Sequence, residues 1–218
     1  MSDYTLHSYF RSSCSARIRI VLGLKGLSYE TVPVNLLKDE HLSDAHRALN
    51  PSATVPLLVC PTADRFSIGQ SVAALEYLEE VHPEVATLPS DPKARAIARS
   101  LVQIINADTQ PVTNMRIMRR VKAFGQDPAE WNKELMADGL RAYEAVASKS
   151  AGKYSVGDAV TMADACLLPA YWNAERYKVD LSQFPTVCKI AASLEDHPAV
   201  KAAHPFRQPD CPEDLRIE

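Results

Sequence analysis

The segment YTLHSYFRSSCSARIRIVLGLKGLSYETVPV, residues 4–34, changes its hydrophobic period twice. Residues 4–7 are short and compatible with a strand, and residues 29–34 alternate polar and apolar side chains as strands do. Between them, residues 14–25 carry apolar side chains at i, i+3 and i+4, and Gly26 is suited to end such a helix. Because a strand–helix–strand crossover is right-handed, the two strands are predicted to be a parallel pair in one sheet.

Strands and helices continue to alternate up to about residue 84. We expect a short helix at residues 38–49, the two strands of an antiparallel hairpin at 55–60 and 65–68, and a helix at 71–81. The order βαβ followed by αββα predicts an α+β domain over residues 1–84.

Beyond residue 91 the strand signals fade and the patterns are helical. Thr161 and Asp164 have the S/T-x-x-D spacing of a helix capping box, directly before an apolar run. The tail after residue 203 holds three prolines and is expected to lie extended on the surface. Helices are expected at 93–121 with a kink at Pro111, at 127–147, from 161 onward, at 184–194 and at 198–203. The sequence therefore predicts an all-α domain over residues 91–218.

The composition is that of a globular protein without affinity for polyanions. The chain has 218 residues, of which 46% are hydrophobic, so it can bury a core, and a disordered chain is excluded. Its 24 basic and 27 acidic residues give a net charge of −3, so we expect no nucleic-acid partner. It contains neither an apolar span of ~18 residues nor the apolar core of a signal peptide, so we expect no membrane partner.

The cysteines and histidines do not form ligand-like patterns. The five cysteines are odd in number, widely spaced and without a C-x-x-C pair, which favours neither a disulfide framework nor a zinc site. The histidines also lack ligand-like spacing, so no metal is expected. Free thiols of this kind fit a reducing, cytoplasmic location.

Residues 11–15, Arg-Ser-Ser-Cys-Ser, lie between the first predicted strand and the first predicted helix. Unpaired backbone N–H groups and the positive end of the helix dipole converge on such a turn and stabilise an anion. That anion could be the thiolate of Cys14 or the thiolate of a bound small molecule. Taken alone, Ser12 or Ser13 is more simply explained as the N-cap of the helix, although one cap needs only one hydroxyl.

The stretch SSCSARIR at residues 12–19 resembles the signature S-S-C-S-x-R-x-R of the zeta-class glutathione transferases. The resemblance covers residues 9–39, 49–56, 70–80, 156–169, 173–186 and 204–210. It implies the glutathione transferase fold, in which a thioredoxin-like α+β domain binds glutathione as cofactor and an all-α domain shapes the co-substrate site. It also implies a homodimer.

The resemblance assigns further residues to glutathione. Pro56 would be a cis-proline, and Val55 before it would offer its N–H and C=O to the peptide like an added strand, although a trans proline is simpler from the sequence alone. Gln70 and Ser71 would bind the γ-glutamyl end, although Ser71 could also serve only as a helix cap. His41 stands where the family has a glutamine that contacts glutathione, which leaves that contact open.

Two pairs of residues complete the implied site. Gln110 and Asn114 match positions with which the family contacts glutathione, in the same or the partner subunit, and otherwise they are one solvated helix face. Arg11 and Arg176 are the expected cations for the carboxylates of a small acidic electrophilic substrate. A surface salt bridge with an acidic neighbour would explain Arg176 equally well.

The activity that the resemblance implies is glutathione-dependent isomerisation of maleylacetoacetate to fumarylacetoacetate, in tyrosine and phenylalanine catabolism. A thiolate adds to the cis double bond, permits rotation and leaves, with Ser12, Ser13, Cys14 and Arg176 as catalytic residues. Three alternatives remain open. They are a zeta-class transferase acting on α-haloacids, a glutaredoxin-like thiol transferase that uses Cys14, and a non-catalytic protein that uses the fold for assembly.

Overall fold

The computed structural model describes residues 4–217 of the chain, and their contacts form two compact units. The first, the sheet unit, comprises Met1–Ala86 and His197–Glu218, and the second, the helical unit, comprises Thr87–Asp196. The helical domain expected at residues 91–218 therefore differs from the helical unit at its C-terminal end, which groups with the sheet.

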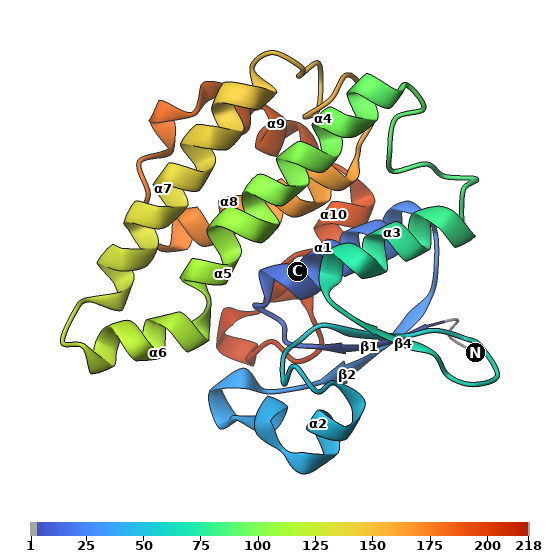
Figure 1. The fold of residues 1–218 in the computed structure, drawn as a ribbon, viewed down its shortest axis with the longest axis vertical. Coiled ribbons are helices and arrows are strands. Elements are labelled where there is room, and N and C mark those ends of the chain that lie inside the picture. The colour runs from blue at the N-terminus through green and yellow to red at the C-terminus, as the bar shows by residue number, and fades with distance from the viewer. Residues whose placement is uncertain (1–3, 218) are drawn as a thin grey trace. The chain divides into compact units, whose positions relative to one another are not determined.

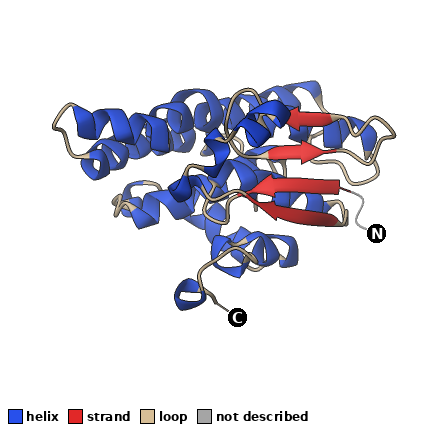
Figure 2. Cartoon of the chain, turned by 90° about the horizontal axis from the view of Figure 1, so that it is seen from below, coloured by secondary structure: helices blue, strands red, loops and turns tan. Residues whose placement is uncertain are grey.

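A four-stranded mixed sheet with the strand order β2-β1-β3-β4 forms the centre of the sheet unit (Figure 2). The strands are β1 (Tyr4–Ser8), β2 (Tyr29–Pro33), β3 (Leu57–Val59) and β4 (Ser67–Gly69). Strands β1 and β2 are parallel, in a register that pairs Tyr4 with Tyr29, and β3 is antiparallel to both β1 and β4. The predicted parallel pair and the predicted hairpin are therefore confirmed.

Helices α1 (Ser13–Leu24) and α3 (Ser71–Val81) lie on one side of this sheet, and α2 (Asp44–Leu49) lies on the other (Figure 1). The helix predicted at residues 71–81 is confirmed at both ends. Apolar side chains of the sheet, α1 and α3 meet in one fully buried layer. Its members include Leu6 and Leu58 of the sheet, Ile18, Val21 and Leu22 of α1, and Leu75 and Leu78 of α3.

The prediction of one continuous helix at residues 38–49 is wrong. The chain instead forms two 3-10 turns before α2, namely η1 (Leu36–Lys38) and η2 (Glu40–Leu42). Asp39 has a left-handed φ of 57°, which the interior of an α-helix does not accommodate. Ser43 is extended and caps α2, because its hydroxyl accepts the His46 N–H at 3.2 Å. The backbone conformation of Asp39 and the cap at Ser43 therefore divide residues 38–49. The spacing of hydrophobic residues gives no sign of either.

The chain after residue 203 is more structured than predicted. Helix α10 (Pro198–Ala203) is confirmed, and the 3-10 helices η5 (Pro205–Arg207) and η6 (Glu213–Leu215) follow it. Pro205 opens η5 and Pro212 precedes η6, because the fixed φ of proline suits the start of a helical turn. The expected extended conformation is therefore wrong, whereas the expected surface location holds for most of these residues and not for the buried Gln208 and Cys211.

The helical unit contains five α-helices longer than one turn, together with shorter helical segments. They are α4 (Pro92–Gln103), the π-helical segment η3 (Ile104–Thr109), α5 (Gln110–Thr113), α6 (Met115–Ala123), α7 (Pro128–Ala147), α8 (Met162–Arg176), η4 (Leu181–Gln183) and α9 (Pro185–Glu195). Asp127 caps α7 by accepting the Ala129 N–H at 2.8 Å. Within residues 4–217, no helix combines the length and apolarity needed to cross a membrane.

The helical pattern predicted at residues 93–121 is interrupted twice. Pro111 lacks an N–H and cannot bond the carbonyl four residues earlier, and the backbone just before it widens into the π-helical η3. Gly139 of α7 leaves room for this widened turn, since a Cβ there would overlap the Thr109 side chain. Asn114 is extended and ends α5 before α6 begins.

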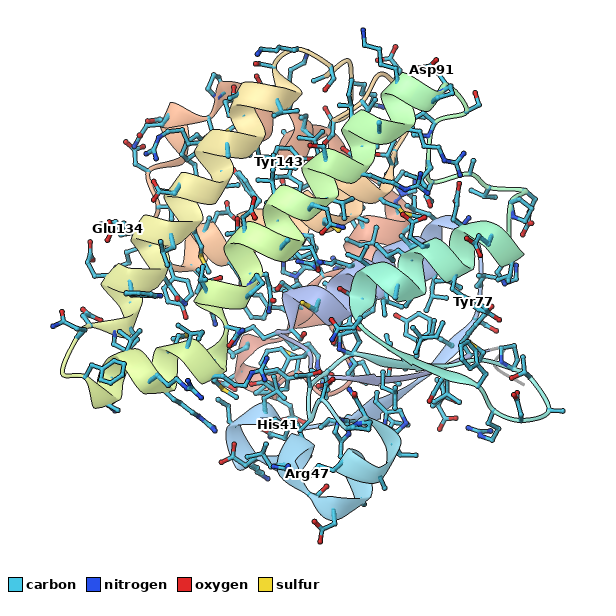
Figure 3. All side chains as sticks on the ribbon, in the orientation of Figure 1. His41, Arg47, Tyr77, Asp91, Glu134 and Tyr143 are labelled. Atoms are coloured by element: carbon cyan, nitrogen blue, oxygen red, sulfur yellow. The ribbon has the colours of Figure 1, made fainter. Side chains whose placement is uncertain are left out.

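Helix α8 begins at the predicted capping box, which is confirmed. The Thr161 N–H donates to Asp164 Oδ2 at 2.7 Å, and Thr161 Oγ1 accepts the Ala163 N–H at 3.2 Å. Asp164 Oδ1 accepts the Ser155 N–H at 2.8 Å, and the Ser155 hydroxyl bonds that of Tyr143 on α7 (Figure 3). Burial raises the pKa of Asp164, and these hydrogen bonds oppose that rise.

We expect Asp164→Ala to lower the free energy of unfolding by about 2–5 kcal/mol, because the buried N–H groups of Ser155 and Thr161 lose their acceptor. Urea denaturation followed by circular dichroism measures this change. The matched control Asp138→Ala removes an exposed carboxylate of the same unit and should cost less than about 0.5 kcal/mol. A wild-type unfolding energy for Asp164→Ala would contradict the role assigned to the capping box.

Candidate functional site

The serine-rich turn joins β1 to α1, and Ser12 is the N-cap of that helix. Its hydroxyl oxygen accepts the Ser15 N–H at 3.2 Å, so the capping interpretation of Ser12 is confirmed. A hydroxyl that accepts a hydrogen bond keeps its own hydrogen as a donor. Ser13 and Cys14 occupy the first turn of α1, and both are half-buried. The turn therefore combines a helix N-terminus, hydroxyl donors and a thiol.

Helix α3 begins close to α1, and a buried arginine links the two helices. Arg17 is completely buried, and its Nη1 donates to the hydroxyl of Ser71, the first residue of α3, at 3.0 Å. Gln70, which precedes Ser71, has a left-handed φ of 81°, a conformation that is costly for a residue with a side chain. The first turn of α3 thus offers backbone N–H groups beside a hydroxyl, as an anion site requires.

A second wall of the site is the loop before β3. The Val55–Pro56 peptide bond is cis, as the resemblance implied. Asn50 Nδ2 and His46 Nε2 both bond the carbonyl oxygen of Thr54, each at 2.9 Å, and both side chains are buried. Among residues 4–217, neither backbone polar group of Val55 has a hydrogen-bond partner. The loop is therefore held at Thr54, and the next residue keeps a donor and an acceptor available for an extended peptide.

The turn before α1 is held by Arg19, a residue to which the sequence analysis gave no role. Arg19 donates to the Phe10 carbonyl at 3.0 Å, to the Ser8 hydroxyl at 3.1 Å and to the Ala203 carbonyl at 3.2 Å. Burial lowers the pKa of Arg19 to about 10, and the nearby side chains of Tyr29 and Asp210 oppose this shift. The side chain therefore remains a cation at neutral pH.

The other predicted residues of the sheet unit occupy different environments. His41 lies on η2 and is buried, whereas Arg47 on the following helix α2 is exposed. Figure 3 labels both residues. Arg11 is half-buried, with its guanidinium carbon 5.7 Å from the centre of the Phe10 ring. A cation in this position is available beside the serine-rich turn.

Three predicted residues belong to the helical unit. Gln110 is the first residue of α5 and is half-buried. The Asn114 carboxamide caps α6 by accepting the Arg116 and Ile117 N–H groups, and its Nδ2 donates to Pro111 O. Its side chain is thus already used in local bonds. Arg176 ends α8, is exposed, and lies 4.6 Å from the centre of the neighbouring Tyr177 ring.

Taken together, the sheet unit offers donors for a small anionic peptide with a thiol. Hydroxyls and N–H groups at the start of α1 suit a thiolate, the first turn of α3 suits a carboxylate, and Val55 suits a peptide backbone. Within the described part of the chain, no group of three or more potential metal ligands occurs.

Two protein-family models match the chain. The glutathione S-transferase N-terminal domain matches residues 11–81, and the glutathione S-transferase C-terminal domain matches residues 113–203. The chain is 55% identical to a maleylacetoacetate isomerase of Aspergillus fumigatus, over 98% of this chain and 95% of that protein. It is 47% identical to the maleylacetoacetate isomerase of Rattus norvegicus, over 97% of this chain and 96% of that protein.

Solved structures match the fold over nearly the whole chain. A holo maleyl pyruvate isomerase, a bacterial zeta-class glutathione S-transferase, matches with a TM-score of 0.91 and 38% identity, over 95% of this chain and 100% of that one. A maleylacetoacetate isomerase from Anaeromyxobacter dehalogenans, with GSH bound in its active site, matches with a TM-score of 0.88 and 40% identity. That match covers 97% of this chain and 100% of the other.

Proposed function

The chain belongs to the zeta class of the glutathione S-transferase family, and from this premise we propose that it is a glutathione-dependent maleylacetoacetate isomerase. The reaction converts maleylacetoacetate to fumarylacetoacetate, a step of tyrosine and phenylalanine catabolism. The observation that carries the proposal is the start of α1, where Ser12 caps the helix with its oxygen and still has a hydrogen to donate. A bound thiolate there would meet both the helix dipole and this hydroxyl.

The donors of the sheet unit suit glutathione, a peptide with one thiol and two carboxylates. We assign the thiol to Ser12, Ser13 and Cys14, and the peptide backbone to Val55 beside Pro56. Bound glutathione supplies a thiolate that can add reversibly to a cis double bond and then leave. The remaining assignments to glutathione are Gln70 and Ser71 for the γ-glutamyl end, His41 in place of a glutamine, and Gln110 and Asn114 from the helical unit.

We assign recognition of the acidic substrate to two arginines. The guanidinium groups of Arg11 and Arg176 can bind carboxylates in a bidentate manner and can stabilise the negative charge that develops on the substrate. The same site would also accept α-haloacids, since these combine a carboxylate with an electrophilic carbon. A glutaredoxin-like reaction would depend on Cys14 in place of the serines.

We also propose that the enzyme is a cytoplasmic homodimer. All five cysteines are free thiols in the structure, which supports a reducing compartment. The homodimer is the state that the family resemblance implies. Light scattering should detect a particle of twice the chain mass of 24.0 kDa.

A direct assay decides among the candidate functions. Purified protein should isomerise maleylacetoacetate only when glutathione is present, and it should leave glutathione unconsumed. Consumption of glutathione with α-haloacids but no isomerisation would favour the transferase alternative. Retention on immobilised glutathione without turnover of either substrate would favour a non-catalytic protein.

We expect Ser12→Ala to lower kcat by roughly one to two decades with a smaller effect on glutathione binding. A charge-assisted hydrogen bond to the thiolate is worth about 1.5–3 kcal/mol, and it acts mainly on the charged sulfur. The matched variant Cys14→Ala should be milder. Steady-state kinetics on both variants tests the assignment. If Cys14→Ala abolishes activity while Ser12→Ala retains it, the thiol-based alternative replaces ours.

Asn50→Ala should raise the KM for glutathione about tenfold, because the Thr54 carbonyl loses one of its two buried donors and Val55 becomes less fixed. The rate at saturating glutathione should stay within about twofold, since the reacting sulfur is bound elsewhere. Glu80→Ala, which removes an exposed side chain of α3 in the same unit, is the control. An unchanged KM for Asn50→Ala would show that the Thr54 contact does not position Val55.

Arg176→Ala and Arg176→Lys should both weaken turnover of carboxylate-bearing substrates, because lysine cannot reproduce the planar guanidinium fork. Glutathione affinity and turnover of a neutral aryl halide should remain close to wild type. Lys189→Ala removes an exposed cation of the same unit and serves as the control. Equal losses on acidic and neutral substrates would make Arg176 structural and leave substrate recognition to Arg11.

A further inference from the structure

The C-terminal segment, residues 204–217, packs against the turn that carries the serine-rich motif. Tyr9 and Phe10 of this turn form a buried apolar cluster with Cys211. Phe206 of the same segment, Val55 before the cis-proline and Leu36 of η1 pack against that cluster. The segment therefore shares one apolar cluster with the turn before α1, and the loop before β3 packs against the same cluster.

Phe10 is held at both of its backbone polar groups. Its N–H donates to Asp210 Oδ2 at 2.7 Å, and its carbonyl accepts from Arg19 Nη2 at 3.0 Å. Ser12 lies only two residues further on, and its own N–H bonds the Tyr9 carbonyl at 2.9 Å. Ser12 is thus tied by sequence and by this hydrogen bond to the turn whose position Phe10 fixes.

The segment that supplies Asp210 is itself fixed by hydrogen bonds. Gln208 is buried, and its Nε2 donates to the carbonyls of Ala202 and His204 at 2.8 and 2.9 Å. Arg216 Nη2 donates to the carbonyls of Pro209 and Cys211 at 3.2 and 2.9 Å, on either side of Asp210. Asp210 is therefore presented to Phe10 from a rigid support.

Stabilising the C-terminal segment is by itself a poor explanation for Asp210. Its second oxygen, Oδ1, is buried and has no hydrogen-bond partner among residues 4–217. A buried oxygen left unsatisfied opposes folding, so an aspartate is an unfavourable choice if the residue only stabilises the tail. Its hydrogen bond fixes the Phe10 N–H, and its charge lies near the buried Arg19, which holds the carbonyl of the same residue.

We propose that the C-terminal segment positions the thiolate-binding turn, and that Asp210 is the positioning residue through which it acts. The inference rests on the proposed function, because it treats Ser12 as the donor to a thiolate. Catalytic groups must be held within about 0.5 Å of their productive geometry, and a misplacement of 1 Å can cost about a hundredfold in rate. A turn fixed at both backbone groups of Phe10 satisfies that requirement.

Three variants of Asp210 test the proposal, with Glu213→Ala as the control for an exposed carboxylate of the same segment. Asp210→Ala should lower kcat about tenfold per folded molecule, and Asp210→Glu, which keeps the charge but moves the oxygens outward, about three- to tenfold. Asp210→Asn still accepts from the Phe10 N–H, so its kcat should stay within about twofold of wild type. Amide hydrogen exchange over residues 9–14 should rise in the alanine variant and remain at the wild-type level in the asparagine variant.

The exchange measurement separates this proposal from the proposed function. A wild-type protein without isomerase activity would contradict the proposed function, and the exchange rates would still test the positioning role. Should Asp210→Ala fail to fold, Asp210→Glu decides. Wild-type kcat and wild-type exchange in Asp210→Glu and Asp210→Ala would overturn the proposal. A lower melting temperature with unchanged kcat per folded molecule would also overturn it.

Discussion

Helix α1 places two guanidinium groups in the interior of the sheet unit. The positions of the serine-rich turn and of the start of α3 depend on the hydrogen bonds that these groups donate. Arg17 and Arg19 are both almost fully buried. Removing such charges from water is costly unless hydrogen bonds replace the solvent, so neither side chain moves without losing those bonds. Because residues at i and i+2 point to different sides of a helix, the two arginines tie α1 in two directions. Arg17 bonds the start of α3 at Ser71, and Arg19 bonds the turn before α1 at Phe10.

This constraint gives a physical reason for the R-x-R part of the signature, which the sequence analysis used only as a resemblance. The hydroxyl-rich half of the motif supplies donors at the start of α1, and the arginine half fixes the two neighbours of that helix end. One short segment thus contains both the proposed thiolate donors and the arginines that fix their surroundings. Burial lowers the pKa of Arg19 to about 10. Because this value is still well above 7, the side chain stays charged at neutral pH.

Elements with a clear hydrophobic period were predictable, and those set by single backbone conformations were not. The α1 and α3 helices, both strand pairs and the α8 capping box follow from local spacing, and the structure has them. The helix expected at 38–49 failed because Asp39 has a positive φ. The pattern at 93–121 is disturbed at Pro111 as expected, whereas the second break, at the extended Asn114, has no signal in the hydrophobic spacing. The site behaves in the same way. Ser12 could be found from its turn, whereas the bond between Phe10 and Asp210 joins positions 200 residues apart and has no local signal.

The capping role of Ser12 and its proposed role toward a thiolate depend on each other. The Ser15 N–H occupies one lone pair of the Ser12 oxygen, so the hydroxyl hydrogen must point elsewhere than into the helix. The helix cap therefore orients the donor, and the same N-terminus adds the positive end of its dipole. Because Phe10 fixes the turn from outside and Ser15 fixes the hydroxyl from within, little rotational freedom remains for Ser12. The role of Ser12 as a helix cap is therefore the physical basis of its proposed role as a donor to the thiolate.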